Sequence, residues 1–457
     1  MSRARDPFSG LTALRPASRR GPVAEADPQS FRGVSPEIRP GAERLAQILG
    51  AAPGRNRFGE HLELRRWFSE QVGTANQFGP PEGAVDLAAL RLIDALAGSE
   101  VADPRQWLFL DTETTGMAGG SGTYAFLVGI AWWDAGGLEV EQLFMREHSE
   151  EHSLLLELAE RMAERPVLVT FNGKSFDWPL LETRYRMTRT IKPPTLRAHL
   201  DFLHPARNLW RSRLGSARLP ELERHVLGWD RGEDMMSELI PSIYFDYLRG
   251  GSPEPLVPIF HHNQMDLRGL AALAARVMAL LANPEEHGQD ALELFGVSRI
   301  CERRGDLRAR DLYERSITGA LPEDADRKAR RSLAQLAKRA GDLERAEALW
   351  SEMLGGSREG LEAYEQLAIY YERTARDFQK AAALAREALA ALRKASRLGM
   401  IQPALHRRYR DRFQRRLARL SRAAHRPLLD AFNAESRAPS AESNPDNIGG
   451  NSHAKSG

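Results

Sequence analysis

Two short hydrophobic runs, each followed by polar residues, predict two buried strands in the first half of the chain. Residues 107–110 lead into Asp111 and Glu113, and residues 167–171 lead into a polar turn and then Asp177 at the start of an expected helix. Residues two apart on a strand point the same way, and burying two carboxylates together is costly unless a cation offsets them. The pattern indicates a divalent metal site, although Asp, Thr and Gly are also ordinary residues of an exposed turn.

A helical pattern later in the chain adds one more acid and two histidines. Apolar residues recur at helical spacing from 267 to 277, directly after Asp266. His262 lies four residues before Asp266 and shares its face if the helix includes both, whereas His261 can reach the acid only if the chain there is a loop. Loops at the carboxyl ends of strands in an α/β sheet converge on one crevice, so these separate segments can meet.

The order and spacing of these residues resemble a known family. Asp-x-Glu at 111–113, Asn-x3-Phe-Asp at 172–177 and His-x3-Asp at 262–266 resemble the DEDD 3′-5′ exonucleases of the ribonuclease H-like superfamily. Residues 119–124 and 200–207 make the chain more similar still to the bacterial YprB-type branch. The resemblance covers about residues 105–282. It implies an α/β fold with a mixed ribonuclease H-like sheet flanked by helices.

The resemblance also implies a mechanism and a set of ligands. Two divalent ions, Mg²⁺ or Mn²⁺, would be bound by four acids: Asp111, Glu113, Asp177 and Asp266. One ion would help to generate hydroxide and the other would stabilise the leaving 3′ oxygen.

The resemblance further implies that a histidine orients or deprotonates the attacking water. One class of the superfamily has His five residues before the last acid, which fits His261, and another has Tyr four before it. His262 fits the second spacing and the His-Asn pair of the YprB-type branch, and we favour it.

Three further polar residues are candidates for substrate contact. Asn172 and Lys174 follow an expected strand end, where they could bind phosphate or simply cap and solvate the loop. Asp201 interrupts an apolar run and is expected to contact substrate or to support the metal ligands from outside. The glycine-rich stretch at 119–122 lacks the Gly-Lys-Ser/Thr ending of a P-loop, so we expect a hairpin turn before a strand at 124–133.

A four-residue sequence motif, called here the recurring phrase, occurs three times in the second half of the chain. After residue 283 the sequence is rich in helix-forming residues, and RGDL at 304–307 recurs as AGDL at 340–343 and ARDF at 375–378. This spacing is close to the repeat of about 34 residues in tetratricopeptide arrays. We therefore expect tetratricopeptide-like helical repeats, with a plain helical bundle as the alternative.

A basic segment follows the repeats. Residues 393–426 contain twelve Arg or Lys residues and one acid, Asp411, with hydrophobic residues interleaved at helical spacing. Such a helix could bind the phosphates of a nucleic acid, with an affinity that depends on salt concentration and not on base sequence. It could equally be a solvated helix whose apolar side covers the repeats, and the two interpretations are compatible.

The amino-acid composition limits the number of domains and excludes some classes of site, but it does not indicate a function. The chain has 457 residues, 42% of them hydrophobic, and a net charge of +2, so it can bury a sizeable core in two or three domains. Cys301 is its only cysteine, which excludes intrachain disulfides and thiolate zinc clusters. No apolar run approaches the roughly 20 residues of a membrane span, and no secretion signal is evident. These features predict a cytoplasmic protein with no membrane partner.

The expected organisation has six parts. They are a disordered tail over 1–38, an N-terminal extension with short helices over 39–100, a ribonuclease H-like exonuclease domain over 101–283, tetratricopeptide-like repeats over 288–395, a basic helix over 396–430 and a second disordered tail over 431–457.

The sequence predicts a metal-dependent 3′-5′ exonuclease acting on DNA or RNA, with a protein partner possible at the repeats. The alternative is an inert ribonuclease H-like platform whose repeats bind protein or nucleic acid. The complete set of four acids argues against that alternative. Sugar preference, strandedness and oligomeric state stay open.

Overall fold

The computed structural model describes residues 40–69, 83–116, 122–134, 137–232 and 235–435, of which 423–435 are described as backbone only. The tail predicted at 1–38 and most of the glycine-rich turn at 119–122 lie outside these residues. The tail predicted from 431 begins too early, because the last helix continues to Glu435.

A seven-stranded mixed sheet forms the centre of the first half of the chain, as predicted. Its strands run in the order β1-β2-β5-β4-β3-β6-β7. The strands β3, β6 and β7 are parallel to one another, and the other pairings are antiparallel. The bounds are β1 Ala52–Asn56, β2 Gly59–Ser69, β3 Trp107–Thr114, β4 Ala125–Asp134, β5 Gly137–Phe144, β6 Val167–Thr170 and β7 Ala198–Asp201.

The first two strands are a feature that the sequence analysis missed, since it expected only short helices between 39 and 100. The strand β2 pairs along β5, with Arg65 opposite Glu141. Charged residues on β2 hide the alternating pattern by which a strand is recognised. They are accommodated because the side chain of Arg65 binds Glu141 at 2.7 Å across the pair.

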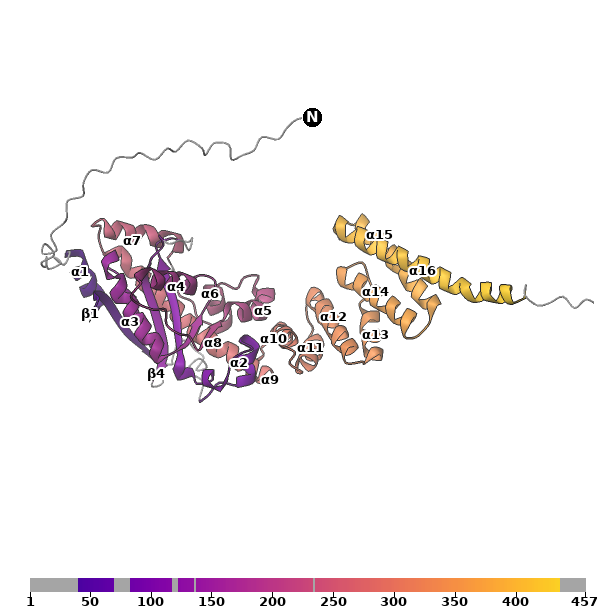
Figure 1. Cartoon of the computed structure of the whole chain (residues 1–457), viewed down its shortest axis with the longest axis horizontal. Helices are drawn as coiled ribbons and strands as arrows, with labels where there is room; N and C mark the ends of the chain where they lie inside the picture. Colours follow the sequence, from indigo (N-terminus) through magenta and orange to yellow (C-terminus); the bar gives the residue numbers. More distant parts are fainter. Residues whose placement is uncertain (1–39, 70–82, 117–121, 135–136, 233–234, 436–457) are drawn as a thin grey trace, which may run out of the picture.

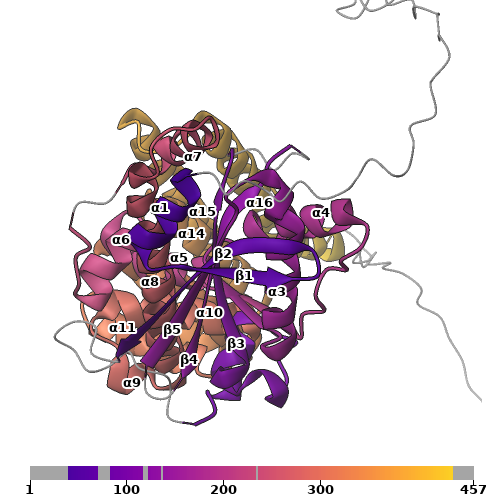
Figure 2. The same cartoon turned by 90° about the vertical axis from the view of Figure 1, so that its left-hand side faces the viewer.

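Helices cover both faces of the sheet (Figure 2). On one face, α8 (Val257–Ala282) packs against β3, β4 and β5, together with α2 (Leu87–Ile93) and α5 (Leu203–Leu214). On the other, α3 (Glu151–Glu164) packs against β1 and β2, beside α4 (Asp177–Thr188). The remaining helices of this half are α1 Pro40–Leu49, α6 Leu219–Leu222, α7 Ile240–Leu248 and α9 Pro284–His287.

The second half is helical and built of pairs, with a last long helix beside them (Figure 1). The pairs are α10 Ala291–Arg304 with α11 Ala309–Thr318, α12 Glu323–Arg339 with α13 Leu343–Glu352, and α14 Arg358–Arg373 with α15 Phe378–Arg397, and the last helix is α16 Pro403–Glu435. The paired arrangement is confirmed, and the tetratricopeptide assignment stays a prediction.

The recurring phrase marks the turn within each pair. Gly305, Gly341 and Arg376 take positive φ angles of 72°, 81° and 56°, a conformation that ends a helix and favours glycine. The aspartate that follows then caps the next helix: Asp342 and Asp377 each accept a backbone N–H three residues on, at 3.2 and 2.8 Å. The repeat therefore encodes a helix stop and a helix start.

The first helix pair shares a core with the α/β half. The core that contains Phe109 also contains Cys301 and Leu312. Trp210 on α5 donates its Nε1–H to Glu293 on α10 at 2.7 Å. One continuous core therefore crosses the boundary predicted between 283 and 288.

The basic helix α16 packs its apolar side against the helical pairs. Tyr409 and Phe413 are buried in their core, while Arg412 binds Glu365 at 2.9 Å and Arg419 binds Glu372 at 2.8 Å. These contacts support the covering role, and phosphate binding by α16 stays a prediction.

Candidate catalytic metal centre

Four acids from three separate segments lie close to one another at the end of the sheet. Asp111 and Glu113 belong to the last half of β3, Asp177 begins α4, and Asp266 lies on α8. Because β3 and β6 are parallel neighbours, the turn that follows β6 delivers Asp177 beside β3. The hydroxyl of Thr112 on β3 donates to Asp177 and fixes this approach.

The pKa of Asp111 is strongly perturbed by its surroundings. Burial, and then the negative charges of Asp266, Glu113 and Asp177, raise the pKa of Asp111 well above its ordinary value. A hydrogen bond of 2.8 Å from Nδ2 of Asn263 acts in the opposite direction. The carboxylates therefore repel one another across the space between β3, α4 and α8.

Asp177 shows the same effect. Burial raises its pKa to about 6, the hydrogen bond from Thr112 opposes this, and the charge of Asp201 adds to it. At neutral pH the group carries negative charge that the surrounding chain does not fully offset. Carboxylate oxygens are the preferred ligands of Mg²⁺ and Mn²⁺, so this donor set fits divalent ions.

An arginine occupies one side of the acidic group. Arg231 binds Oδ1 of Asp266 at 2.5 Å and Oε1 of Glu223 at 2.6 Å. Burial by itself would lower the pKa of Arg231, but Glu223 and Asp266 together raise it. A cation at Asp266 would have to replace this guanidinium.

The two candidate histidines occupy different sides of α8. The helix begins at Val257, so the chain at His261 is helical rather than a loop, and His261 is exposed. His262 is buried, with its Nε2 at 3.5 Å from Oδ2 of Asp266 and 3.9 Å from Oε1 of Glu113. The structure thus brings His262 to the acids, and its catalytic role stays a prediction.

The predicted substrate residues lie in and beside the turn after β6. Asp201 is buried and accepts three backbone N–H groups, from Asn172, Lys174 and Leu203, each at 3.0 Å. These bonds hold the turn that leads to Asp177 and so agree with one of the two expected roles of Asp201, support of the metal ligands from outside, while its contact with substrate stays a prediction. Asn172 adopts a positive φ of 73° in this turn, and Lys174 is exposed to solvent.

The sequence analysis named Asn263 only as part of the His-Asn pair, and it missed the contact of Asn263 with Asp111 and the two residues that support it, Gln142 and Gly129. Asn263, which donates to Asp111, accepts a hydrogen bond of 2.7 Å from Gln142 on β5. Gln142 lies opposite Gly129, which in turn lies opposite Asp111. A Cβ at Gly129 would lie 2.1 Å from Oδ1 of Asn263, so glycine makes room for this contact. Only strand register brings Gln142 and Gly129 to this place, and no local sequence signal could have revealed these two residues.

Comparison with known proteins places the chain in a family. A sequence profile of the RNase_H superfamily matches residues 108–278, which include all four acids. The uncharacterized protein YprB of Bacillus subtilis (strain 168) is 32% identical over 290 residues, covering 62% of this chain and 68% of the relative. The chain belongs to the YprB family.

For this YprB-family protein the expected ribonuclease H superfamily and YprB relationships are both supported, and 3′-5′ exonuclease activity stays a prediction. Among solved structures, a family B DNA polymerase from the hyperthermophilic archaeon Pyrobaculum calidifontis is similar with a TM-score of 0.33 and 15% identity. That match spans 44% of this chain and only 29% of the polymerase, too partial to bear on function. Within the described residues, no helix is long and apolar enough to cross a membrane.

Proposed function

We propose that this YprB-family protein is a metal-dependent 3′-5′ exonuclease that hydrolyses the terminal phosphodiester bond of DNA or RNA. The observation that carries the proposal is the grouping of four acids from β3, α4 and α8 at one end of the sheet, and the raised pKa of Asp111 among them supports it. A chain gains nothing in stability from carboxylates that repel one another, so their grouping favours a functional cation site.

The four acids are the residues that would hold the ions: Asp111, Glu113, Asp177 and Asp266. Bound Mg²⁺ or Mn²⁺ would help to activate the attacking water and stabilise the negative charge that develops on the phosphate. The protein supplies the fixed geometry. Asn263 orients Asp111, Thr112 orients Asp177, and the bonds to Asp201 hold the turn that precedes Asp177.

In this proposal His262 orients the attacking water and accepts its proton. An imidazole can take up a proton near neutral pH, and Nε2 of His262 faces the oxygens of Glu113 and Asp266. The nearby carboxylates would stabilise the imidazolium that forms. The exposed ammonium of Lys174 is the candidate contact to a substrate phosphate.

A strand-shortening assay tests the activity. The full chain is incubated with Mn²⁺ or Mg²⁺ and with 5′-labelled single-stranded DNA and RNA of equal sequence. We expect a ladder that shortens from the 3′ end, that a chelator abolishes and that Asp111→Asn slows by at least about 100-fold. The matched control is Asp134→Asn, an exposed acid at the end of the neighbouring strand β4, which should retain the wild-type rate.

The absence of both strand shortening and Mn²⁺ binding would count against the proposed exonuclease activity. If neither strand is shortened and no Mn²⁺ binds to the purified chain, the alternative of an inert platform gains support. The helical pairs would then be the part to test for protein or nucleic-acid binding.

A further inference from the structure

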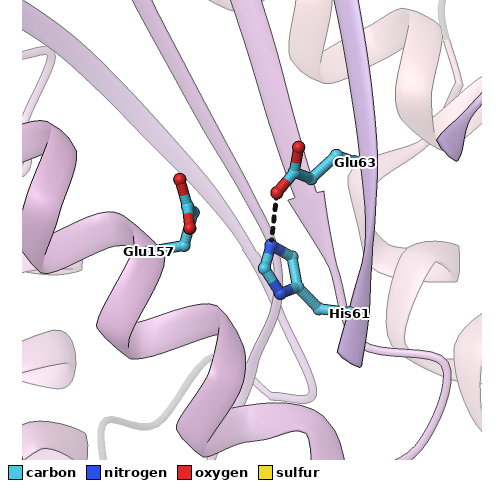
Figure 3. A group of neighbouring side chains, drawn as sticks. All are labelled: His61, Glu63 and Glu157. Carbon is cyan, nitrogen blue, oxygen red and sulfur yellow. Dashed lines mark ion pairs between the residues drawn. The ribbon is translucent and has the colours of Figure 1, made fainter. Parts of the chain in front are cut away.

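A histidine and two glutamates form a second group of metal-binding side chains, between β2 and α3 (Figure 3). His61 and Glu63 lie on β2 and Glu157 lies on α3. Each can offer one ligand atom such that the three atoms lie within 4.8 Å of one another. His61 is fully buried, and the two glutamates are half-buried.

This group lies on the opposite face of the sheet from the acidic centre. Asp111, Gly129, Gln142 and Leu64 are successive partners across β3, β4, β5 and β2, and directly opposed residues point to the same face. Glu63 adjoins Leu64 in sequence and therefore points the other way, toward α3. The two groups do not share ligands.

The hydrogen bonds of Ser153 favour a proton on Nδ1 of His61. The hydroxyl of Ser153 donates to the carbonyl oxygen of Gly59 at 3.1 Å. It has no second hydrogen, so towards Nδ1 of His61, at 2.9 Å, it must act as acceptor. Nδ1 therefore donates, and in the neutral ring Nε2 has a free lone pair.

The other ring nitrogen of His61, Nε2, faces the two carboxylates. Nε2 of His61 is buried and has no hydrogen-bond partner among the described residues. It lies 3.1 Å from Oε1 of Glu63, with which it forms an ion pair when the ring is protonated (Figure 3). In the neutral ring this buried acceptor nitrogen faces carboxylate oxygens, which is unfavourable, and a cation between the nitrogen and the carboxylates would offset the repulsion.

We propose that His61, Glu63 and Glu157 bind one divalent transition-metal ion of the Zn²⁺ type. One imidazole nitrogen and two carboxylate oxygens are a donor set that suits Zn²⁺. A ligating histidine usually donates its other N–H to a nearby oxygen, which fixes its orientation, and Ser153 accepts such a bond here. The ion would tie β2, near the edge of the sheet, to α3.

Binding requires a small local rearrangement. Zinc–ligand bonds are about 2.0–2.2 Å long, so the three ligand atoms must draw closer than they are. Glu157 must also give up its ion pair with Arg161, at 2.8 Å. Arg161 keeps a second partner, Glu141, at 2.8 Å, so its guanidinium is not left unpaired.

Zinc stoichiometry tests the proposal in the full chain. Equilibrium dialysis is performed in an Asp111→Asn, Asp177→Asn background, so that ions at the acidic centre do not contribute. We expect one Zn²⁺ per chain, and we expect Glu157→Gln to weaken its binding by at least about tenfold. The matched control is Glu160→Gln, an exposed acid on the same helix, which should bind as the background does.

Two further measurements separate the metal site from an ordinary His61–Glu63 ion pair. Bound Co²⁺ should give an absorption spectrum that Glu63→Gln abolishes, and Ser153→Ala should weaken Zn²⁺ binding by about 10- to 100-fold. Equal Zn²⁺ binding by Glu157→Gln, Glu63→Gln and Glu160→Gln, all folded by circular dichroism, would overturn the proposal. None of these readouts depends on nuclease activity.

Discussion

The two faces of the sheet both bury carboxylates, but they treat the charge in opposite ways. On the α3 face Glu141 is fully buried and receives Arg65 at 2.7 Å and Arg161 at 2.8 Å. On the α8 face Asp111 lies among three other acids that raise its pKa. On the α3 face, arginines of the chain itself neutralise the buried carboxylate. On the α8 face, most of the positive charge needed to neutralise the acids has to come from a bound cation.

This difference separates structural from functional acids. A buried carboxylate with its own arginines needs nothing from outside the chain, and its removal should cost stability. A carboxylate among other carboxylates costs stability until a cation arrives, and its removal should cost activity. Substitutions on the two faces should therefore give opposite patterns in the two measurements.

The largest effect we expect beyond the metal ligands is at the histidines of α8. His262→Ala should lower the rate of strand shortening by about 100-fold, because it removes the group that accepts a proton from water. His261→Ala should leave the rate within about twofold, because that side chain is exposed. The measurement is the initial rate at saturating Mn²⁺. Equal losses in both variants would exclude a specific role for His262.

On the other face, Glu141→Gln should reduce the free energy of unfolding by about 2 kcal/mol. Removing one partner of a buried ion pair typically costs about 3–5 kcal/mol, and we reduce this figure because the side chain of Arg65 is half exposed. Urea denaturation measures the change, and nuclease activity of the folded variant should be unaffected.

The control for that substitution lies two residues away on the same strand. Burial raises the pKa of Glu139, so its charged form is disfavoured, and Glu139→Gln should be neutral or slightly stabilising. A similar loss of stability in both variants would mean that the ion pairs of Glu141 do not explain its burial.

The fold could be predicted from sequence where the pattern is local. Residues 107–110 and 167–171 predict β3 and β6 because buried parallel strands are continuously apolar. The repeated turn phrase predicts the helix pairs because its glycine and aspartate act on adjacent residues. The strand β2 was missed because ion pairs with a distant strand compensate its charged residues, and such compensation cannot be seen in one segment.

The same limit applies to the candidate site. The four acids stand out because each lies next to a run of residues with a recognisable pattern: Asp111 and Glu113 after an apolar run within β3, Asp177 at the start of α4, and Asp266 before the apolar-periodic part of α8. Gln142 and Gly129 do not, since only the register of β3, β4 and β5 connects them to Asp111. The contact of Arg231 with Asp266 depends on the path of a loop, which no periodicity describes.

The last effect we expect concerns the cost of charge in the acidic centre without metal. Folding raises the pKa of Asp177 from an ordinary 3.8 to about 6, so the folded chain binds more protons than the unfolded chain between these values. Its stability therefore falls as pH rises through this window. In chelator at pH 7, Asp177→Asn should raise the free energy of unfolding by about 1–3 kcal/mol.

The pH dependence distinguishes this cause from altered packing. The gain from Asp177→Asn should disappear below about pH 4, where the carboxyl is protonated in both the folded and the unfolded chain. Mn²⁺ should shrink or reverse the gain at pH 7, because the ion stabilises only the chain that retains its ligand. A gain that is independent of both pH and metal would show that the burial of this negative charge is not its source, and the contrast between the two faces would then lose its electrostatic basis.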